Sequence, residues 1–301
     1  AAVILAEMTG YEYADIIVRA ILPAFLYFLG IFLGVHFKAK KLGLVGLKRE
    51  ELPKWKLLLP KIYLLLPLIV LTWMVIAGQT MAKSAIYGTI VAIVVGIINK
   101  DDRMTPTKFV NGLENGGKNC LSVGIACGMA GIIAGVVTMT GLGQVLIGAI
   151  VGLSNGHLII ALVLTMLCCI VLGMGVPTTA NYIIMATTCA PILASGMGLD
   201  LMAAHMFCFY FGIVADITPP VALAAYAGSA IAKAPPMKTA WNATRLAIAA
   251  FIIPYIFAYN NALIFVGNDV KFLSVASIVI SATLGMASIA SGLMGYLIRD
   301  M

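Results

Sequence analysis

Two short polar segments interrupt long apolar stretches of this sequence, and each combines proline with threonine. Residues 173–182 are GMGVPTTANY, and residues 216–221 are DITPPV. Proline lacks an amide donor and disrupts a helix, so both segments predict helix breaks. Backbone carbonyls freed near 172–176 and 214–218, together with threonine hydroxyls, are hard oxygen ligands that suit an alkali cation. The half-helices that restart near Thr178 and Val221 begin with unpaired amides, which attract anions.

The residue types at these breaks nominate two sets of ligands. The candidate ligands of a cation are Gly173, Gly175, Val176, Thr179, Ile217, Thr218 and Pro219. The candidate ligands of an anionic solute are Thr178, Thr179 and Asn181, because no Lys or Arg lies at either break. Pro177, Pro220 and Asp216 are accessory candidates. The simpler alternative is a pair of proline kinks patched by neighbouring helices.

Asp216 is the only carboxylate near the predicted centre of the membrane. An ionisable group at that depth is expensive, so it is a functional candidate by default. Its alternative role is to cap the adjacent half-helix.

The composition predicts a membrane as the solvent for these breaks. Hydrophobic residues make up 62% of the 301 residues and charged residues 10%, against about 45–50% and about 25% in soluble domains. In lipid, helices satisfy their own backbone groups while apolar side chains face acyl chains. We therefore predict an all-α, polytopic integral membrane protein.

Apolar runs of about 20 residues mark the spans. The candidates are 15–36, 62–78, 84–98, 119–140, 158–193 and 201–232 (both broken), 246–265 and 272–298. Residues 144–153 are too short to span, and the amphipathic stretches 107–118 and 237–244 are expected along the cytoplasmic interface.

The basic residues predict the topology. All but Arg19, Lys83 and Lys271 lie in 37–61, in 99–118, between 233 and 245, or at Arg299. If these clusters are all cytoplasmic, residues 158–193 must enter and leave from the outer face as a re-entrant hairpin with its tip near 173–179. Residues 201–232 are then a single crossing, unwound at its centre.

Other functions fit the residues less well. The six cysteines lie in apolar stretches without zinc-ligand spacing and are expected to be small buried hydrophobes. The three histidines are scattered, and no phosphate-binding glycine loop or second intramembrane carboxylate accompanies Asp216. The basic clusters explain the net charge of +7 without nucleic acid. We expect no enzyme, no organic cofactor and no metal beyond the alkali cation; a channel or passive scaffold is the alternative.

Several of these segments together resemble the large permease subunit of TRAP (tripartite ATP-independent periplasmic) transporters, and specifically its TAXI branch. They are 172–182 (LGMGVPTTANY), 190–193 (APIL), 215–228 (ADITPPVALAAYAG), 236–241 (PMKTAW), 251–261 (FIIPYIFAYNN), 39–53 (AKKLGLVGLKREELP) and 131–143 (GIIAGVVTMTGLG). Each segment is weak alone, but their order along nearly the whole chain is specific.

The resemblance implies an elevator-type transporter with two inverted repeats in a bacterial or archaeal cytoplasmic membrane. It also implies sodium-coupled uptake of a small organic anion such as a carboxylate, delivered by a periplasmic binding protein. The hairpin tip would be 173–179 and the unwound loop 217–221, which together form the sodium site and one wall of the substrate site of the second repeat.

The sequence departs from that pattern in one respect. The hairpin and Pro-Pro break of the first repeat and the small-subunit region are missing, and residues 1–7 resemble the helix that follows them. We therefore expect 1–14 to end a first-repeat helix, 15–118 to be scaffold, 119–232 the second-repeat transport region and 233–301 C-terminal helices. Such a C-terminal half is not expected to transport alone.

Overall fold

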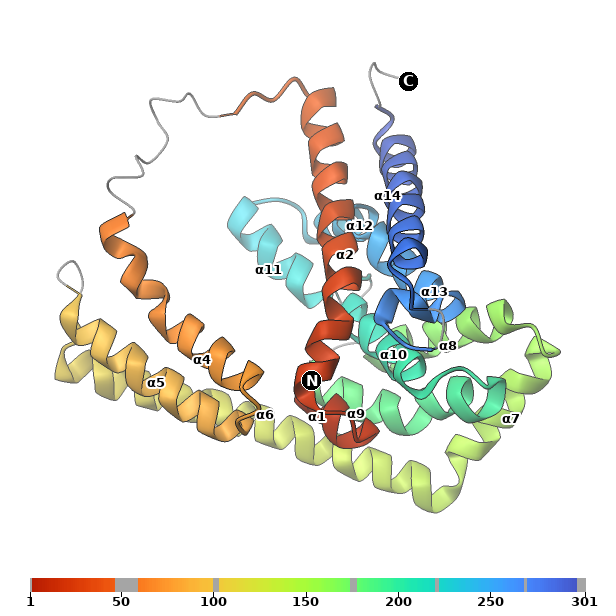
Figure 1. The fold of residues 1–301 in the computed structure, drawn as a ribbon, viewed down its shortest axis with the longest axis horizontal. Coiled ribbons are helices and arrows are strands. Elements are labelled where there is room, and N and C mark those ends of the chain that lie inside the picture. The colour runs from red at the N-terminus through yellow and green to blue at the C-terminus, as the bar shows by residue number, and fades with distance from the viewer. Residues whose placement is uncertain are drawn as a thin grey trace. The chain divides into compact units, whose positions relative to one another are not determined.

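The computed structural model describes residues 2–46, 59–99, 103–173, 178–219, 222–267 and 270–296, and the elements in these ranges are helices (Figure 1). The chain divides into two compact units. The first contains Ala1–Tyr11, Ile16–Leu44 and Val123–Met301, and the second contains Glu12–Asp15 and Val45–Ser122. Both predicted breaks lie in the first unit. Gly175, Val176, Pro177 and Pro220 fall outside the described residues.

The helices of the first unit are α1 (Ala2–Thr9), α2 (Tyr13–Lys41, from Ile16 on), the later part of α6 (Pro106–Thr140), α7 (Leu142–Ser154), α8 (Leu158–Gly173), α9 (Thr178–Thr188), the π-helix η2 (Ile192–Gly196), α10 (Leu201–Ala215), α11 (Leu223–Ala232), α12 (Pro236–Leu246), α13 (Ile248–Tyr259), the 3₁₀ helix η3 (Asn261–Ile264) and α14 (Phe272–Met294). Those of the second unit are η1 (Leu59–Leu65), α4 (Leu66–Ile76), α5 (Met81–Ile98) and the start of α6.

Helix α10 is the centre of the first unit. Twelve of its 15 residues are buried, and it lies between α8 and α13 (Figure 1). Asp200 begins the helix by accepting hydrogen bonds from the amides of Met202 and Ala203 at 2.8 and 3.3 Å, as an N-cap carboxylate does. Because most of its residues are covered by other helices, α10 is positioned by its neighbours.

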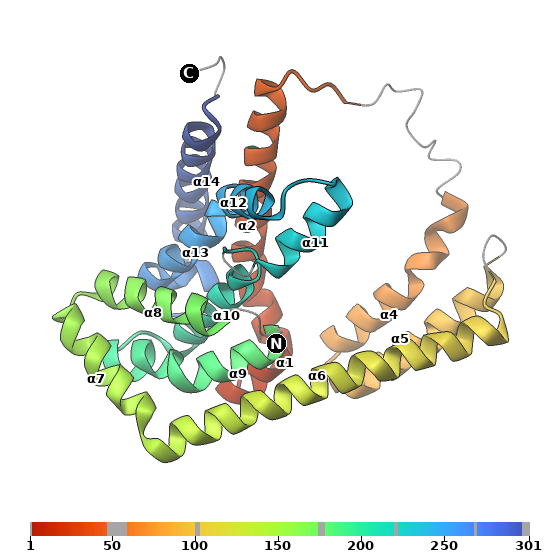
Figure 2. The ribbon, with the colours of Figure 1, turned by 180° about the vertical axis from the view of Figure 1, so that it is seen from behind.

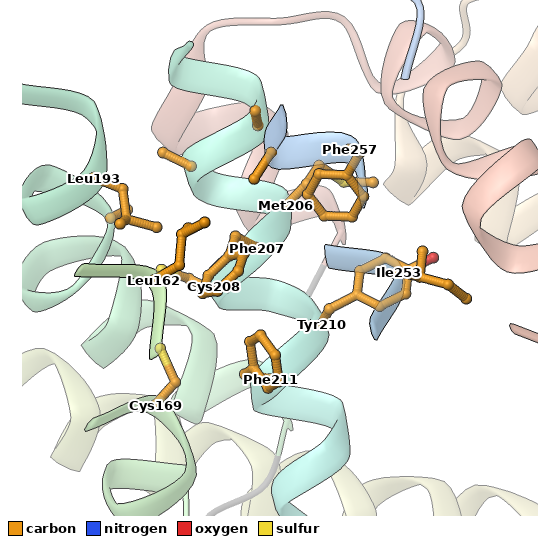
Figure 3. Packing of buried hydrophobic residues seen from close by; sticks show 14 of the residues in the cluster. Leu162, Cys169, Leu193, Met206, Phe207, Cys208, Tyr210, Phe211, Ile253 and Phe257 are labelled. Carbon is orange, nitrogen blue, oxygen red and sulfur yellow. The ribbon is translucent and has the colours of Figure 1, made fainter. Parts of the chain in front are cut away.

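Aromatic packing holds α10 against α13. The ring of Phe207 lies 4.8 Å from that of Phe211, and both rings contact Tyr255 of α13 edge-on at 5.5 and 6.1 Å. On the other side, Leu162 and Cys169 of α8 belong to the same buried cluster (Figure 3). Because interdigitated rings have few alternative arrangements, the C-terminal end of α10 is held in a defined place.

Within the described residues, four helical stretches are long and apolar enough to cross a membrane: Tyr13–Lys41, Leu59–Ile76, Pro236–Tyr259 and Phe272–Met294. Their outward faces carry large apolar side chains. On α2, Phe25, Phe28 and Phe32 are 55, 67 and 64% exposed, which lipid tolerates and water does not. The prediction of an all-α, polytopic membrane protein is confirmed.

Some helix limits differ from those predicted. Residues 107–118 and 119–140 form one helix, α6, rather than an interfacial helix followed by a span. The glycine pair at Gly116 and Gly117 lowers helix propensity by about 1 kcal/mol per residue but does not stop the helix. Lys118 and Glu114 pair across one turn of it at 2.6 Å. The sequence changes from amphipathic in 107–118 to apolar in 119–140, but no residue in 107–140 is incompatible with helical backbone.

The span predicted at 246–265 is also subdivided. The helix is interrupted at Ala247, so the amphipathic α12 leads directly into α13, which ends at Tyr259. Phe265, at the end of η3, has a left-handed φ of 53°, which helical backbone does not allow. The segment therefore ends in a turn, which its apolar composition did not predict.

Three of the cysteines, Cys169, Cys189 and Cys208, are buried as expected, and Cys168 is partly buried. Cys120 is exposed, and for this residue the expectation of burial was wrong. Cys120 lies on α6 in the second unit. The residues around it are apolar, but no other described helix covers its side chain.

Candidate functional site

The described part of α8 reaches the first polar segment, and α10 ends where the second polar segment begins. Helix α8 ends at Gly173 and α9 begins at Thr178, while α10 ends at Ala215 and α11 begins at Leu223. The re-entrant course of the first segment and the unwinding of the second stay predictions.

The ends of α8 and α10 meet at Gly173. A Cβ atom at this position would lie 2.5 Å from Asn181 Nδ2, 2.7 Å from Ala215 Cβ and 3.1 Å from Met185 Cε. Separations below about 3 Å cannot be accommodated without displacing the neighbours. The last residue of α8 therefore has to be glycine for α10 to approach it this closely. The structure brings the last described residue of α8 and the end of α10 together.

Asn181 joins the same junction from the first turns of α9. Its side chain is fully buried, and Nδ2 donates a 3.1 Å hydrogen bond to the carbonyl of Gly212 on α10. Among the described residues, Oδ1 has no hydrogen-bond partner. A buried acceptor without a partner costs about 1–3 kcal/mol. Such an atom is therefore a candidate ligand of a group that the protein itself does not supply.

At the second break, more of the backbone carbonyls accept hydrogen bonds than the sequence predicted. The carbonyl of Val214 accepts from the hydroxyl of Thr218 at 2.7 Å and from the amide of Ile217 at 3.1 Å. The carbonyl of Ala215 accepts from the amide of Thr218 at 3.3 Å, and that of Asp216 from the amide of Ala224 at 3.1 Å.

The next two carbonyls are also engaged. That of Ile217 accepts from the hydroxyl of Thr244 at 3.0 Å, and that of Thr218 from the amide of Ala222 at 3.2 Å. A carbonyl has two lone pairs, and from Ala215 to Thr218 each of these bonds occupies one of them. A cation at this break would use the second lone pair of carbonyls that are already held in position.

Backbone conformation marks the second break as well. Ala222 is fully buried and has φ 38° and ψ 47°, a left-handed conformation that costs a non-glycine residue about 1 kcal/mol or more. Contacts with the surrounding structure must therefore hold Ala222 in this conformation. Strained backbone of this kind gathers at functional sites.

Asp216 is partly buried at the C-terminal end of α10. Within the described residues its carboxylate has no hydrogen-bond or ion-pair partner, and no side chain caps α11. Capping by this carboxylate therefore receives no support. Thr178 and Thr179 are partly buried in the first turn of α9. Pro219 is partly buried beside the hydrogen-bonded turn.

Two features of the site were missed from the sequence. Thr244 lies on α12, in a stretch assigned to the membrane interface, yet it holds the carbonyl of Ile217. Tyr182 and His205 form a buried pair, with 2.7 Å between Tyr182 Oη and His205 Nδ1, which joins α9 to α10. The two residues are 23 positions apart in the sequence, so their pairing is not visible there.

Comparison with known proteins assigns the chain to a family. Residues 1–272 match the family model described as "Tripartite ATP-independent periplasmic transporter, DctM component". No curated protein and no solved structure is significantly similar to the chain. Proteins of this family are permeases for secondary transport that work with a periplasmic binding protein and a small subunit. The chain, a multi-pass membrane protein, belongs to the DctM family of TRAP transporter permeases.

Proposed function

We propose that this permease takes up a small organic anion, such as a carboxylate, together with sodium ions across a bacterial or archaeal cytoplasmic membrane. We further propose that it belongs to the TAXI branch and forms the second inverted repeat of an elevator-type transporter. The observation that carries the proposal is the junction of Gly173, Asn181 and Ala215, where the ends of α8 and α10 meet around an unpartnered buried oxygen.

The cation would bind at this junction. Its proposed ligands are the carbonyls of Gly173, Gly175, Val176, Ile217, Thr218 and Pro219 and the hydroxyl of Thr179. To these we add Oδ1 of Asn181, because its full burial suits a dehydrated ion better than a solute that enters from water. A hard cation prefers such oxygen ligands. The sequence predicts Asn181 as a substrate ligand, but the burial of its side chain favours the cation instead.

The substrate anion would bind at the start of α9. Thr178 and Thr179 are more accessible than Asn181, and the N-terminus of a helix stabilises a nearby negative charge by about 0.3–1 kcal/mol. No basic side chain competes for the anion at either break. Binding of sodium next to this helix start would add positive charge, which gives a physical basis for coupling the two solutes.

Uptake into proteoliposomes tests the proposal. The chain is reconstituted with the remaining permease parts and the binding protein of its own source. Radiolabelled carboxylates are then offered with an inward sodium gradient, or with the same gradient of choline. We expect saturable uptake that needs both sodium and the binding protein. Flux that persists without either would instead support the channel alternative, and the chain alone is expected to be inactive.

A further inference from the structure

A basic pocket of about 380 Å³ lies where α2, α12 and α14 come together. It is lined by Lys38, Lys238, Asn242, Arg245, Leu246, Leu293 and Met294. The polar residues of α12 recur at helical spacing and so share one face. In both views α12 lies between the upper parts of α2 and α14 (Figures 1 and 2). This pocket is formed by helix ends and plays no part in the junction described above.

The charges of this lining are unbalanced. Lys38, Lys238 and Arg245 are cationic, and the described lining contains no Asp or Glu. Like charges placed together repel, so such a cluster predicts an anion as its partner. Arg245 donates one hydrogen bond to the carbonyl of Leu293 at 3.4 Å, but a guanidinium has five donors. Capping of the end of α14 therefore uses only one of the donors of Arg245. Among the described contacts, neither Lys38 nor Lys238 caps a helix end.

The rest of the pocket identifies the kind of anion. Leu246, Leu293 and Met294 supply an apolar wall, which a small hydrated anion would not use. Helices α2 and α14 are long and apolar enough to cross a membrane, and both end here, so the pocket would lie at headgroup depth. Trp241 on α12 is 58% exposed, as aromatic side chains at the membrane interface are.

We propose that this pocket binds the phosphate headgroup of an anionic phospholipid, with the acyl chains along α2 and α14. The two lysines and Arg245 hold the phosphate, Asn242 adds a hydrogen bond, and the apolar wall contacts the first methylenes. Basic pockets between membrane helices have this affinity for anionic headgroups in general. The ligand would join the ends of three helices and is independent of the transport chemistry.

Native mass spectrometry of the full chain in detergent tests this site. The chain is titrated with phosphatidylglycerol, with phosphatidylcholine and with inorganic phosphate as a competitor. The test variant is Lys38→Gln/Lys238→Gln/Arg245→Gln. Its control, Lys40→Gln/Arg103→Gln/Lys108→Gln, removes the same charge from basic segments outside the pocket.

We expect a tightly retained phosphatidylglycerol that inorganic phosphate does not displace. Each basic group near an anionic lipid is worth about fivefold in affinity, so the test variant should bind about a hundredfold more weakly. The control variant should bind like the parent chain. Arg245→Lys, which keeps the charge, should bind within about threefold of the parent.

Three results would overturn the proposal. One is equal binding by the test and control variants, and another is equal affinity for phosphatidylcholine. The third is displacement of lipid by equimolar inorganic phosphate, which would identify a free-anion site. If the triple variant is not monodisperse, Lys238→Gln alone, with an expected loss of about fivefold, decides in the same way.

Discussion

Gly173→Ala is the sharpest test of the junction between the two helix breaks. The new methyl group would lie 2.5 Å from Asn181 Nδ2 and 2.7 Å from Ala215 Cβ. Neither contact can be relieved by turning the end of a long, flexible side chain. Ala215 is carried by the backbone of α10, and Asn181 is held by its 3.1 Å hydrogen bond to Gly212. Helix α8 and α10 must therefore separate, or the bond must break.

The expected cost follows from these contacts. Overpacking of a well-packed interior costs about 1–3 kcal/mol, and loss of the Asn181 hydrogen bond adds about 1 kcal/mol. We expect Gly173→Ala to lower the free energy of unfolding by about 2–4 kcal/mol. Unfolding is followed by circular dichroism in mixed micelles. Gly148→Ala on α7 is the matched control, because a methyl group there meets nothing within 4 Å and should be neutral or stabilising by up to about 1 kcal/mol.

The same variant separates packing from function. The purified chain is unfolded in sodium chloride and in choline chloride, and the parent chain should be more stable in sodium. Gly173→Ala should lose this difference, and Gly148→Ala should keep it. Parent-like stability of Gly173→Ala would refute the packing described here. Lower stability with an intact sodium response would refute the cation site and leave the packing standing.

Further predictions concern neighbouring residues. Thr179→Ala and Pro219→Ala should each lower sodium-driven uptake about tenfold or more by removing a ligand or its placement, with membrane insertion unchanged; parent-like uptake in both would remove the site assignment. Asp216→Asn should impair uptake if the charge matters, and normal rates would show that it does not. Tyr182→Phe leaves His205 Nδ1 without its partner and should lower unfolding free energy by about 1–3 kcal/mol, whereas Tyr259→Phe, on an exposed ring, should change it little.

The sequence alone was sufficient for the class of protein and for the position at which α10 ends. Its apolar runs are so long that only a membrane can solvate them, and glycine and proline act locally on the backbone. These effects depend on nearest neighbours along the chain, which is why α10 ends beside the polar segment 216–221.

Only the tertiary structure decided which groups meet. Gly173 contacts Asn181 and Ala215 because three helices pack around it, and Thr244 reaches the carbonyl of Ile217 from another helix. Such contacts depend on the packing of side chains distant in sequence, and composition does not encode them. The same holds for the basic pocket, where Lys38 and Arg245 are neighbours only after folding. Local backbone chemistry determined where α10 ends, and helix packing determined what surrounds that end.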